Sequence, residues 1–390
     1  MTNLPKRLLS IDVFRAITMF LMIFVNDVAG VDNIPSWIGH TQADEDGMGF
    51  ADIIFPTFLF IVGLSMPWAL RKRIQKGDSF ISIFYHIFSR SFALIVMGFY
   101  HVNMESYSDE SMLPKAIWGL LITLSFFLVW LDYPLAINKI LKYALISLGA
   151  AALITMALLY KGGEGGQTHG MEPSWWGILG IIGWAYLVSA VVFTVIRANI
   201  YLHLSATMLF LAINITSHLQ LMPFDIPVVG DASSIMLIML GALVSLMYSI
   251  LTERNREEAL WSLLAGTAVA LTALGFFIRP YAGGISKIMA TPAWVTICSG
   301  IAILFFAGMI WLIDIKKKQD WFSWISAAGT STLTCYLMPY ILYFIFDLAG
   351  FWYPAVLNSG LPGILRSLSI SFLLIVLVKK MEKKKLRLKI

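Results

Sequence analysis

The sequence has little charge for its length. Only 13% of its 390 residues are charged, compared with about 25% in an average soluble domain. No hydrophilic stretch is long enough to form a separate soluble domain. These absences exclude a soluble enzyme carried on one anchor and predict a single integral membrane domain over residues 1–390.

Motifs of several enzyme classes are also missing. The chain contains no H-E-x-x-H zinc motif, no P-loop, no G-x-S-x-G turn and no dinucleotide fingerprint. The acidic run at 44–46 lacks the glycine and ligand spacing of an EF-hand, so no metal site is expected. The two cysteines, Cys298 and Cys335, lie in apolar segments and are expected to be small core residues.

Hydrophobic residues dominate instead, at 58% of the chain and a mean hydropathy of +0.79. A membrane-spanning helix needs about 20 mostly apolar residues. The sequence therefore predicts an all-α polytopic membrane protein with twelve helices, or eleven because the boundaries at 196–198 and 348–360 are weak. We expect the first segment to be retained, because it lacks the small-residue cleavage site of a signal peptide. The predicted segments are 11–30, 51–70, 82–101, 114–132, 141–160, 175–195, 199–219, 233–251, 260–278, 292–313, 326–347 and 361–379.

Basic residues are distributed unevenly between the loops. With a cytoplasmic N-terminus, 22 of the 28 Lys and Arg residues lie at the inner face, and only Lys115, Lys161, Arg279 and Lys287 lie in outer loops. Cytoplasmic loops carry such an excess of Lys and Arg, so we expect both termini to be cytoplasmic. The net charge of +5 then reflects topology, and nucleic acid is not an expected partner. The outer loops are 31–50, 102–113, 161–174, 220–232, 279–291 and 348–360.

Ionisable side chains at membrane depth are costly and mark candidate functional sites. The first predicted helix carries Asp12 and Arg15 near its inner end, and Asn26 and Asp27 near its outer end. Because Asp12 and Arg15 are three residues apart, they share one helix face and can pair. Arg90 lies inside the third predicted helix, where its guanidinium would either pair with Asp12 or bind an anion such as phosphate.

The stretch GHTQADEDGMGFADIIFP joins the first two predicted helices on the outer side. Asp52 starts the second helix and is either its N-terminal cap or a partner of His40. His40 is either a solvated loop residue or a proton-transfer group, since imidazole titrates near neutrality. His101 and Asn103 end the third helix on the same side, where they could line a cavity.

Four stretches, taken together, resemble the heparan-α-glucosaminide N-acetyltransferase family, in particular its bacterial branch. They are RLLSIDVFRAITMFLMIFVND, the outer loop with its histidine, FADIIFPTFLFIVGLS and SRSFALIVMGF. The resemblance is strong over residues 7–103 and weaker at GTSTLTCYL (329–337), and Pro339 stands where the family has a late histidine. It implies a membrane acetyltransferase that takes acetyl from cytosolic acetyl-CoA. The acceptor would be the amino group of a terminal glucosamine of a glycan, such as a heparan-type oligosaccharide, on the periplasmic side of the bacterial inner membrane.

The same resemblance implies roles for outer residues. His40 would be the general base, with Asp52 or Asp27 orienting its imidazole. Asn26 or Asn103 would donate a hydrogen bond to the thioester oxyanion. An ungapped alignment places Gln42 opposite the family histidine, but His40 is the only histidine in the loop and is assigned to that role. Asn103 matches an outer asparagine of the family.

At the inner face, the resemblance places Arg15 and Arg90 on the CoA side of the membrane. Charge-assisted hydrogen bonds from guanidinium groups suit the phosphates of CoA. Asp12 is assigned to the same acetyl-CoA-binding group because it neighbours Arg15. Asp27 and His101, at the outer ends of their helices, are assigned with Asn103 to acceptor binding.

Alternatives remain open at the level of the sequence. An O-acetyltransferase of an envelope polysaccharide would use the same layout with a hydroxyl acceptor. A secondary transporter also fits twelve helices with both ends inside, although the two halves share no motif. An acetyl-histidine intermediate is an alternative to direct transfer. The expected partners are an aminosugar or oligosaccharide acceptor and the lipid bilayer, with a homodimer as a further option.

Overall fold

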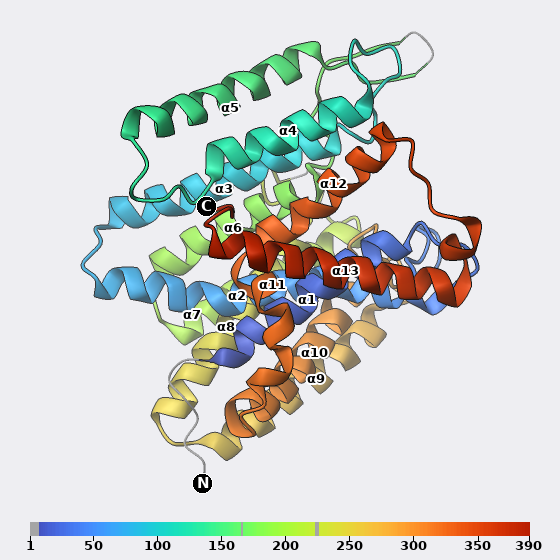
Figure 1. Ribbon diagram of the computed structural model, residues 1–390. Coiled ribbons are helices and arrows are strands. Elements are labelled where there is room, and N and C mark those ends of the chain that lie inside the picture. The colour runs from blue at the N-terminus through green and yellow to red at the C-terminus, as the bar shows by residue number, and fades with distance from the viewer. Residues whose placement is uncertain (1–7, 165–166, 223–225) are drawn as a thin grey trace.

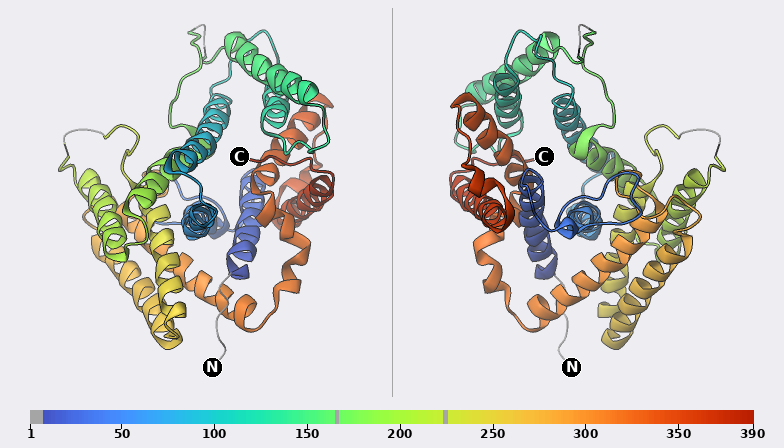
Figure 2. Two further views of the ribbon diagram at one scale, coloured as in Figure 1. Left: turned by 90° about the vertical axis from the view of Figure 1, so that its left-hand side faces the viewer. Right: turned by 90° about the vertical axis from the view of Figure 1, so that its right-hand side faces the viewer.

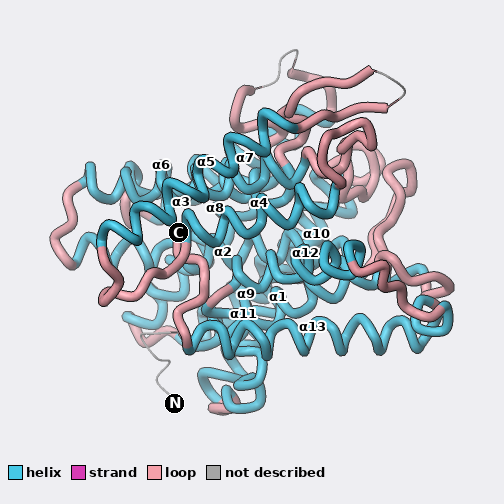
Figure 3. Tube along the Cα trace, turned by 45° about the horizontal axis from the view of Figure 1, so that its top comes forward, coloured by secondary structure: helices cyan, strands magenta, loops and turns pink. Residues whose placement is uncertain are grey.

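The computed structural model describes residues 8–164, 167–222 and 226–390. Within these ranges every regular element is a helix, and the only β-type pairings are isolated bridges between loops (Figure 3). The prediction of an all-α polytopic membrane protein is thus confirmed for the described part of the chain. The α-helices are α1 (Leu9–Val28), α2 (Phe50–Gln75), α3 (Phe80–Val102), α4 (Lys115–Trp130), α5 (Lys139–Leu159), α6 (Gly177–Ile196), α7 (Ile200–His218), α8 (Ser233–Glu253), α9 (Glu257–Ile278), α10 (Pro292–Met309), α11 (Ser326–Thr330), α12 (Thr332–Leu348) and α13 (Gly360–Lys383).

Each of the twelve predicted segments coincides with a helix or a helix pair. In the described residues, ten helices are long and apolar enough to cross a membrane. Helix α4 is shorter, with 16 residues. The predicted single helix 326–347 needs correction, because the helical stretch Gln319–Thr330, which ends in α11, meets α12 at an angle of 78°, and the two count as one further span only if taken together.

The break between α11 and α12 has a packing cause. Gly329 ends α11 so close to α1 that an added Cβ atom would lie 2.5 Å from the carbonyl oxygen of Asp12. The chain then turns through Ser331, whose φ of −124° and ψ of 45° are not helical. The predicted segment is therefore divided where its backbone contacts a helix that is distant in sequence, which hydropathy does not report.

Polar contacts between loops divide the molecule into two faces. At one face, Asp46 binds Arg279 and the backbone of Asp32 bonds to that of Asn358. At the other, the N–H of Leu9 donates to Asp314. All of these contacts join loops or helix ends that the sequence predicts on one side, as helices that cross alternately require. Which face is cytoplasmic stays a prediction from the Lys and Arg bias.

Helices α1 and α2 lie near the middle of the bundle, and the other helices surround them (Figures 1 and 2). Small residues allow the closest backbone approaches. A Cβ atom on Gly63 of α2 would lie 2.0 Å from the carbonyl oxygen of Ile238 on α8, and one on Gly241 would lie 2.1 Å from that of Phe60. Glycine at such crossings brings membrane helices into backbone contact, which fixes α2 and the residues at its outer end.

Candidate active site

A cavity of about 550 Å³ opens at the predicted inner face between α1, α2, α3, α6, the α11–α12 break and the end of the chain. Its lining includes four basic side chains, Arg15, Arg90, Arg387 and Lys389, and one acidic side chain, Asp12. Figure 2 shows the C-terminal segment reaching the middle of the helix arrangement. This excess of positive charge makes the inner cavity suited to a polyanion.

The guanidinium of Arg15 is held from several sides. It donates to the carbonyl oxygen of Gly329 at 3.1 Å and to the hydroxyl of Ser65, and it lies 3.5 Å from Asp12. The predicted Asp12–Arg15 pair is therefore present. Arg90 lies with its guanidinium 4.9 Å from the ring centre of Tyr186. Both arginines are thus oriented toward the cavity by their neighbours.

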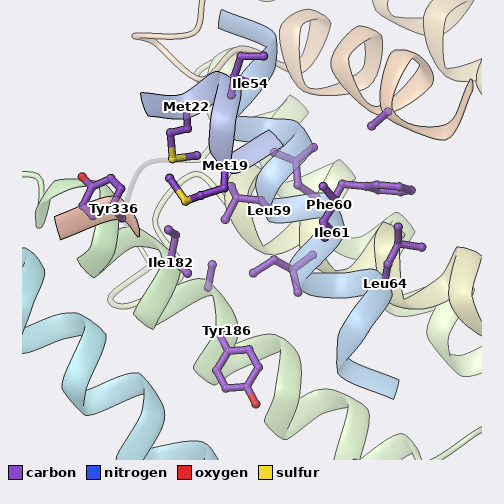
Figure 4. Packing of buried hydrophobic residues seen from close by; sticks show 14 of the residues in the cluster. Met19, Met22, Ile54, Leu59, Phe60, Ile61, Leu64, Ile182, Tyr186 and Tyr336 are labelled. Carbon is purple, nitrogen blue, oxygen red and sulfur yellow. The ribbon is translucent and has the colours of Figure 1, made fainter. Parts of the chain in front are cut away.

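A second cavity of about 360 Å³ lies toward the predicted outer face. Asn26 and Asp27 line it from the outer end of α1, and Tyr340 lines it from α12. Met19 and Tyr336 line both the inner and the outer cavity. Figure 4 shows Met19 of α1 near Tyr336, with the sulfur atom directed toward it. The two cavities therefore adjoin at these two side chains.

His40 and Asp52 form a close pair at the outer end of α2. The Nδ1 atom of His40 lies 2.6 Å from Oδ1 of Asp52. The other carboxylate oxygen of Asp52 accepts hydrogen bonds from the N–H groups of Thr41, at 3.0 Å, and Gly49, at 2.9 Å. Asp52 is 1% exposed, whereas the side chain of His40 is 35% exposed. The carboxylate thus caps α2 and holds the imidazole at once, so both interpretations of Asp52 apply.

A lysine from a distant loop completes this cluster. The Nζ atom of Lys287 lies 3.2 Å from Nδ1 and 3.4 Å from Nε2 of His40. Burial lowers the pKa of Lys287 from its usual value, and the charge of Asp52 opposes that shift. Among the described residues, no group of three or more His, Cys, Asp or Glu side chains is arranged to hold a metal ion. The outer cluster therefore brings together three kinds of acid–base group, an imidazole, a carboxylate and an ammonium.

Comparison with known proteins now bears on this site. The family model described as "Domain of unknown function (DUF5009)" matches residues 7–222, more than half of the chain. The chain belongs to the DUF5009 family.

Two curated relatives connect this DUF5009 protein to an enzyme family. It is 38% identical to the heparan-alpha-glucosaminide N-acetyltransferase of Homo sapiens over 103 residues. These residues make up 26% of this chain and 15% of that protein. It is 35% identical over 98 residues to the enzyme of the same name from Mus musculus, 25% of this chain and 14% of that one. The predicted resemblance to this enzyme family is confirmed. The matched region is a small part of each relative.

The structure divides the predicted site residues of the DUF5009 protein into groups. Arg15, Arg90 and Asp12 line the inner cavity, as the sequence placed them. Asn26 and Asp27 line the outer cavity, whereas His40 is in the lining of neither cavity. Of the two carboxylates considered as partners for the imidazole, Asp52 lies beside it. Asp27 forms an ion pair with Arg366 at 3.4 Å instead.

His101 and Asn103 differ sharply in their surroundings. His101 stacks on Tyr340, with ring centres 4.4 Å apart, and the described chain gives neither of its ring nitrogens a hydrogen-bond partner. It thus supports the wall of the outer cavity from behind. The amide nitrogen of Asn103 donates to the carbonyl oxygens of Phe99 and Glu172, and its Oδ1 accepts from the N–H of Glu172. This geometry favours a structural role for Asn103, joining α3 to the next outer loop.

Two functional candidates escaped the sequence analysis. Arg366 lies inside α13, pairs with Asp27, donates to Asn358 and has its guanidinium 4.6 Å from the ring centre of Tyr353. The rule that intramembrane charges mark sites would have identified it. Lys287 was counted only as an outer basic residue, and its position beside His40 depends on a contact between residues 247 apart in sequence.

Proposed function

We propose that this DUF5009 protein is a membrane acetyltransferase that transfers acetyl from cytosolic acetyl-CoA to the amino group of a terminal glucosamine of a glycan on the outer side of a bacterial cytoplasmic membrane. The similarity to N-acetyltransferases of heparan α-glucosaminide supports the reaction class. The observation that carries the proposal is the pair of adjoining cavities, one basic and inner, one outer, that share Met19 and Tyr336.

The inner cavity is suited to the CoA portion of the donor. CoA carries several phosphate charges and cannot cross the apolar bundle freely, so it would stay at the face that holds Arg15 and Arg90. Guanidinium groups bind phosphate through charge-assisted hydrogen bonds. Arg387 and Lys389 bring further positive charge to the same wall. The pantetheine arm is thin and mostly apolar, and it would extend along the path past Met19 and Tyr336.

The outer residues supply the acid–base chemistry. The Nδ1 hydrogen of His40 is donated to Asp52, which leaves Nε2 as the proton acceptor. The acceptor nitrogen attacks the thioester carbon and loses a proton to His40. The amide of Asn26 donates to the oxyanion. The carbon–sulfur bond then breaks, and the CoA thiolate takes the proton from His40. This step regenerates neutral His40 and releases CoA to the inner face.

The decisive experiment measures CoA release by the purified protein supplied with acetyl-CoA and glucosamine, with a heparan-derived amino sugar as a second acceptor. We expect amine-dependent release in the wild type and none in H40A, while H40A still binds acetyl-CoA. H169A is the matched control, because His169 lies in a different outer loop, with Nδ1 3.6 Å from a carboxylate oxygen of Glu172.

The outcomes separate the competing functions. Release that depends on hydroxyl sugars alone would assign O-acetylation. Uptake of sugar into vesicles without acetyl-CoA would assign transport. Full turnover in H40A would refute the site. Labelled acetyl trapped on wild-type protein without acceptor, and absent from H40A, would assign the acetyl-histidine route.

A further inference from the structure

The loop between α9 and α10 is built to present Lys287 to the outer loop that carries His40. The two residues before Lys287 are both buried and both bound to that loop. The N–H of Ile285 donates to Asp46 at 2.7 Å, its carbonyl oxygen accepts from Gly47 at 2.9 Å, and the hydroxyl of Ser286 donates to Ala43 at 3.5 Å. The backbone position of Lys287 is therefore set by the hydrogen bonds of the two preceding residues.

A glycine at the start of this segment supports the same conclusion. Gly284 has a φ of +71°, and an added Cβ atom would lie 2.8 Å from the carboxylate of Asp46. Any other residue would strain the backbone and press against that carboxylate. Arg279 also binds Asp46, at 2.9 Å. The two loops are thus fastened together by the residues that precede the lysine.

The geometry around His40 limits what Lys287 can do. Its ammonium is nearly equidistant from both ring nitrogens, while the hydrogen on Nδ1 is directed to Asp52. An ammonium in that place does not form one directed hydrogen bond to a single ring nitrogen. Its influence on the ring is therefore mainly electrostatic. A nearby cation disfavours the protonated form of an imidazole, and a nearby carboxylate favours it.

We propose that Lys287 is a positioning residue that counterbalances Asp52, so that His40 stays a neutral base in the presence of a buried carboxylate. This role rests on the proposed function, since it concerns the same proton transfer. The titratable groups that act on the pair are Asp52 from α2 and the buried thiol of Cys298 from α10, while Asp46 and Arg279 of the same two loops are paired with each other. Among the residues that the structure describes, Lys287 is the one that places a positive charge directly against the ring.

The test follows the His40 ring directly by NMR, with labelled histidine in the full-length protein, and uses H40Q to assign its signals. In Lys287→Met, we expect the pH midpoint of the His40 signals to rise by about one unit, because the opposing charge is gone. Lys287→Arg should restore the midpoint to within a few tenths of a unit. Lys115→Met, an exposed outer lysine, is the control. An unchanged midpoint in Lys287→Met would overturn the proposal.

Turnover gives a second readout that separates the two proposals. The acid limb of kcat/KM should move to higher pH in Lys287→Met in step with the NMR midpoint, with acetyl-CoA binding unchanged. If the wild type transfers no acetyl while the NMR shift occurs, the proposed function fails, but the electrostatic effect of Lys287 on the His40 ring is still shown. If Lys287→Met and Lys287→Gln both fail to fold while Lys287→Arg folds, Lys287 is structural and the positioning role is refuted.

Discussion

Asp52 and His40 are 12 residues apart in sequence, yet their side chains meet at 2.6 Å. The carboxylate makes this contact while it accepts two backbone N–H groups at the start of α2. Asp52 is held in place by the start of the helix that it caps. The imidazole that it binds is therefore held in place by a membrane-spanning helix as well. A loop histidine thereby gains the fixed orientation that proton transfer needs.

The first prediction concerns that carboxylate. Asp52→Asn keeps the shape of the side chain but removes the charge that orients the imidazole. We expect kcat to fall about 100-fold or more, with acetyl-CoA affinity unchanged, because Asp52 does not line the inner cavity. Steady-state kinetics with a separate binding titration would check this. Asp78→Asn, at an inner ion pair with Arg73, is the control. A wild-type kcat in the first variant would contradict the role.

A second prediction addresses the inner cavity. Arg15→Met should weaken acetyl-CoA binding about tenfold, since a hydrogen bond to a charged group contributes roughly 1.5–3 kcal/mol. Arg15→Lys should recover only part of this loss, because an ammonium lacks the planar fork that reaches both Gly329 and Ser65. Calorimetric titration would measure both, with the exposed inner residue Lys76 changed to Met for comparison. Equal affinities would remove Arg15 from the donor site.

The third prediction tests the junction between the cavities. Met19→Trp should stop transfer to an outer acceptor, because a bulky ring would fill the space that Met19 and Tyr336 leave open. Binding of acetyl-CoA should change by less than about threefold, since phosphate contacts dominate affinity for such a ligand. Met19→Leu conserves volume and should stay active. Normal transfer by Met19→Trp in sealed vesicles would show that acetyl does not pass this point.

A fourth prediction concerns pH. The hydrogen bond from the N–H of Ile285 is the main cause that lowers the pKa of Asp46 below its usual 3.8; burial opposes this shift, and Arg279 adds to it. A carboxylate with a lowered pKa stabilises the folded state above its ordinary pKa, and that stabilisation is lost as pH falls through the lowered value. Asp46→Asn should therefore reduce protection of the 279–291 loop from hydrogen exchange at pH 6. The difference from wild type should vanish in stronger acid, and a constant difference at every pH would contradict this linkage.

Hydropathy predicted the segments that form the long apolar helices of the described residues. A helix that crosses a lipid bilayer needs a long apolar run, however it packs against its neighbours. The Asp12–Arg15 and His40–Asp52 pairs were also within reach, since their members are near each other in the chain. The turn at Ser331 was not, because its cause is the backbone of α1 against Gly329. The position of Lys287 was hidden for a similar reason, as it depends on how two outer loops dock. Arg366 could have been found, since an arginine within an apolar helix is itself a signal.

The Asp27–Arg366 pair has a consequence for how the protein is made. Its side chains are only 5% and 10% exposed, and they come from α1 and α13, the first and the last helix of the described residues. A ribosome would deliver Asp27 into the membrane long before its partner is synthesised. Until α13 is inserted, the carboxylate of Asp27 at the outer end of α1 must therefore be solvated by water, lipid headgroups or the insertion machinery. This ion pair can therefore form only after α13 has been synthesised and has packed beside α1.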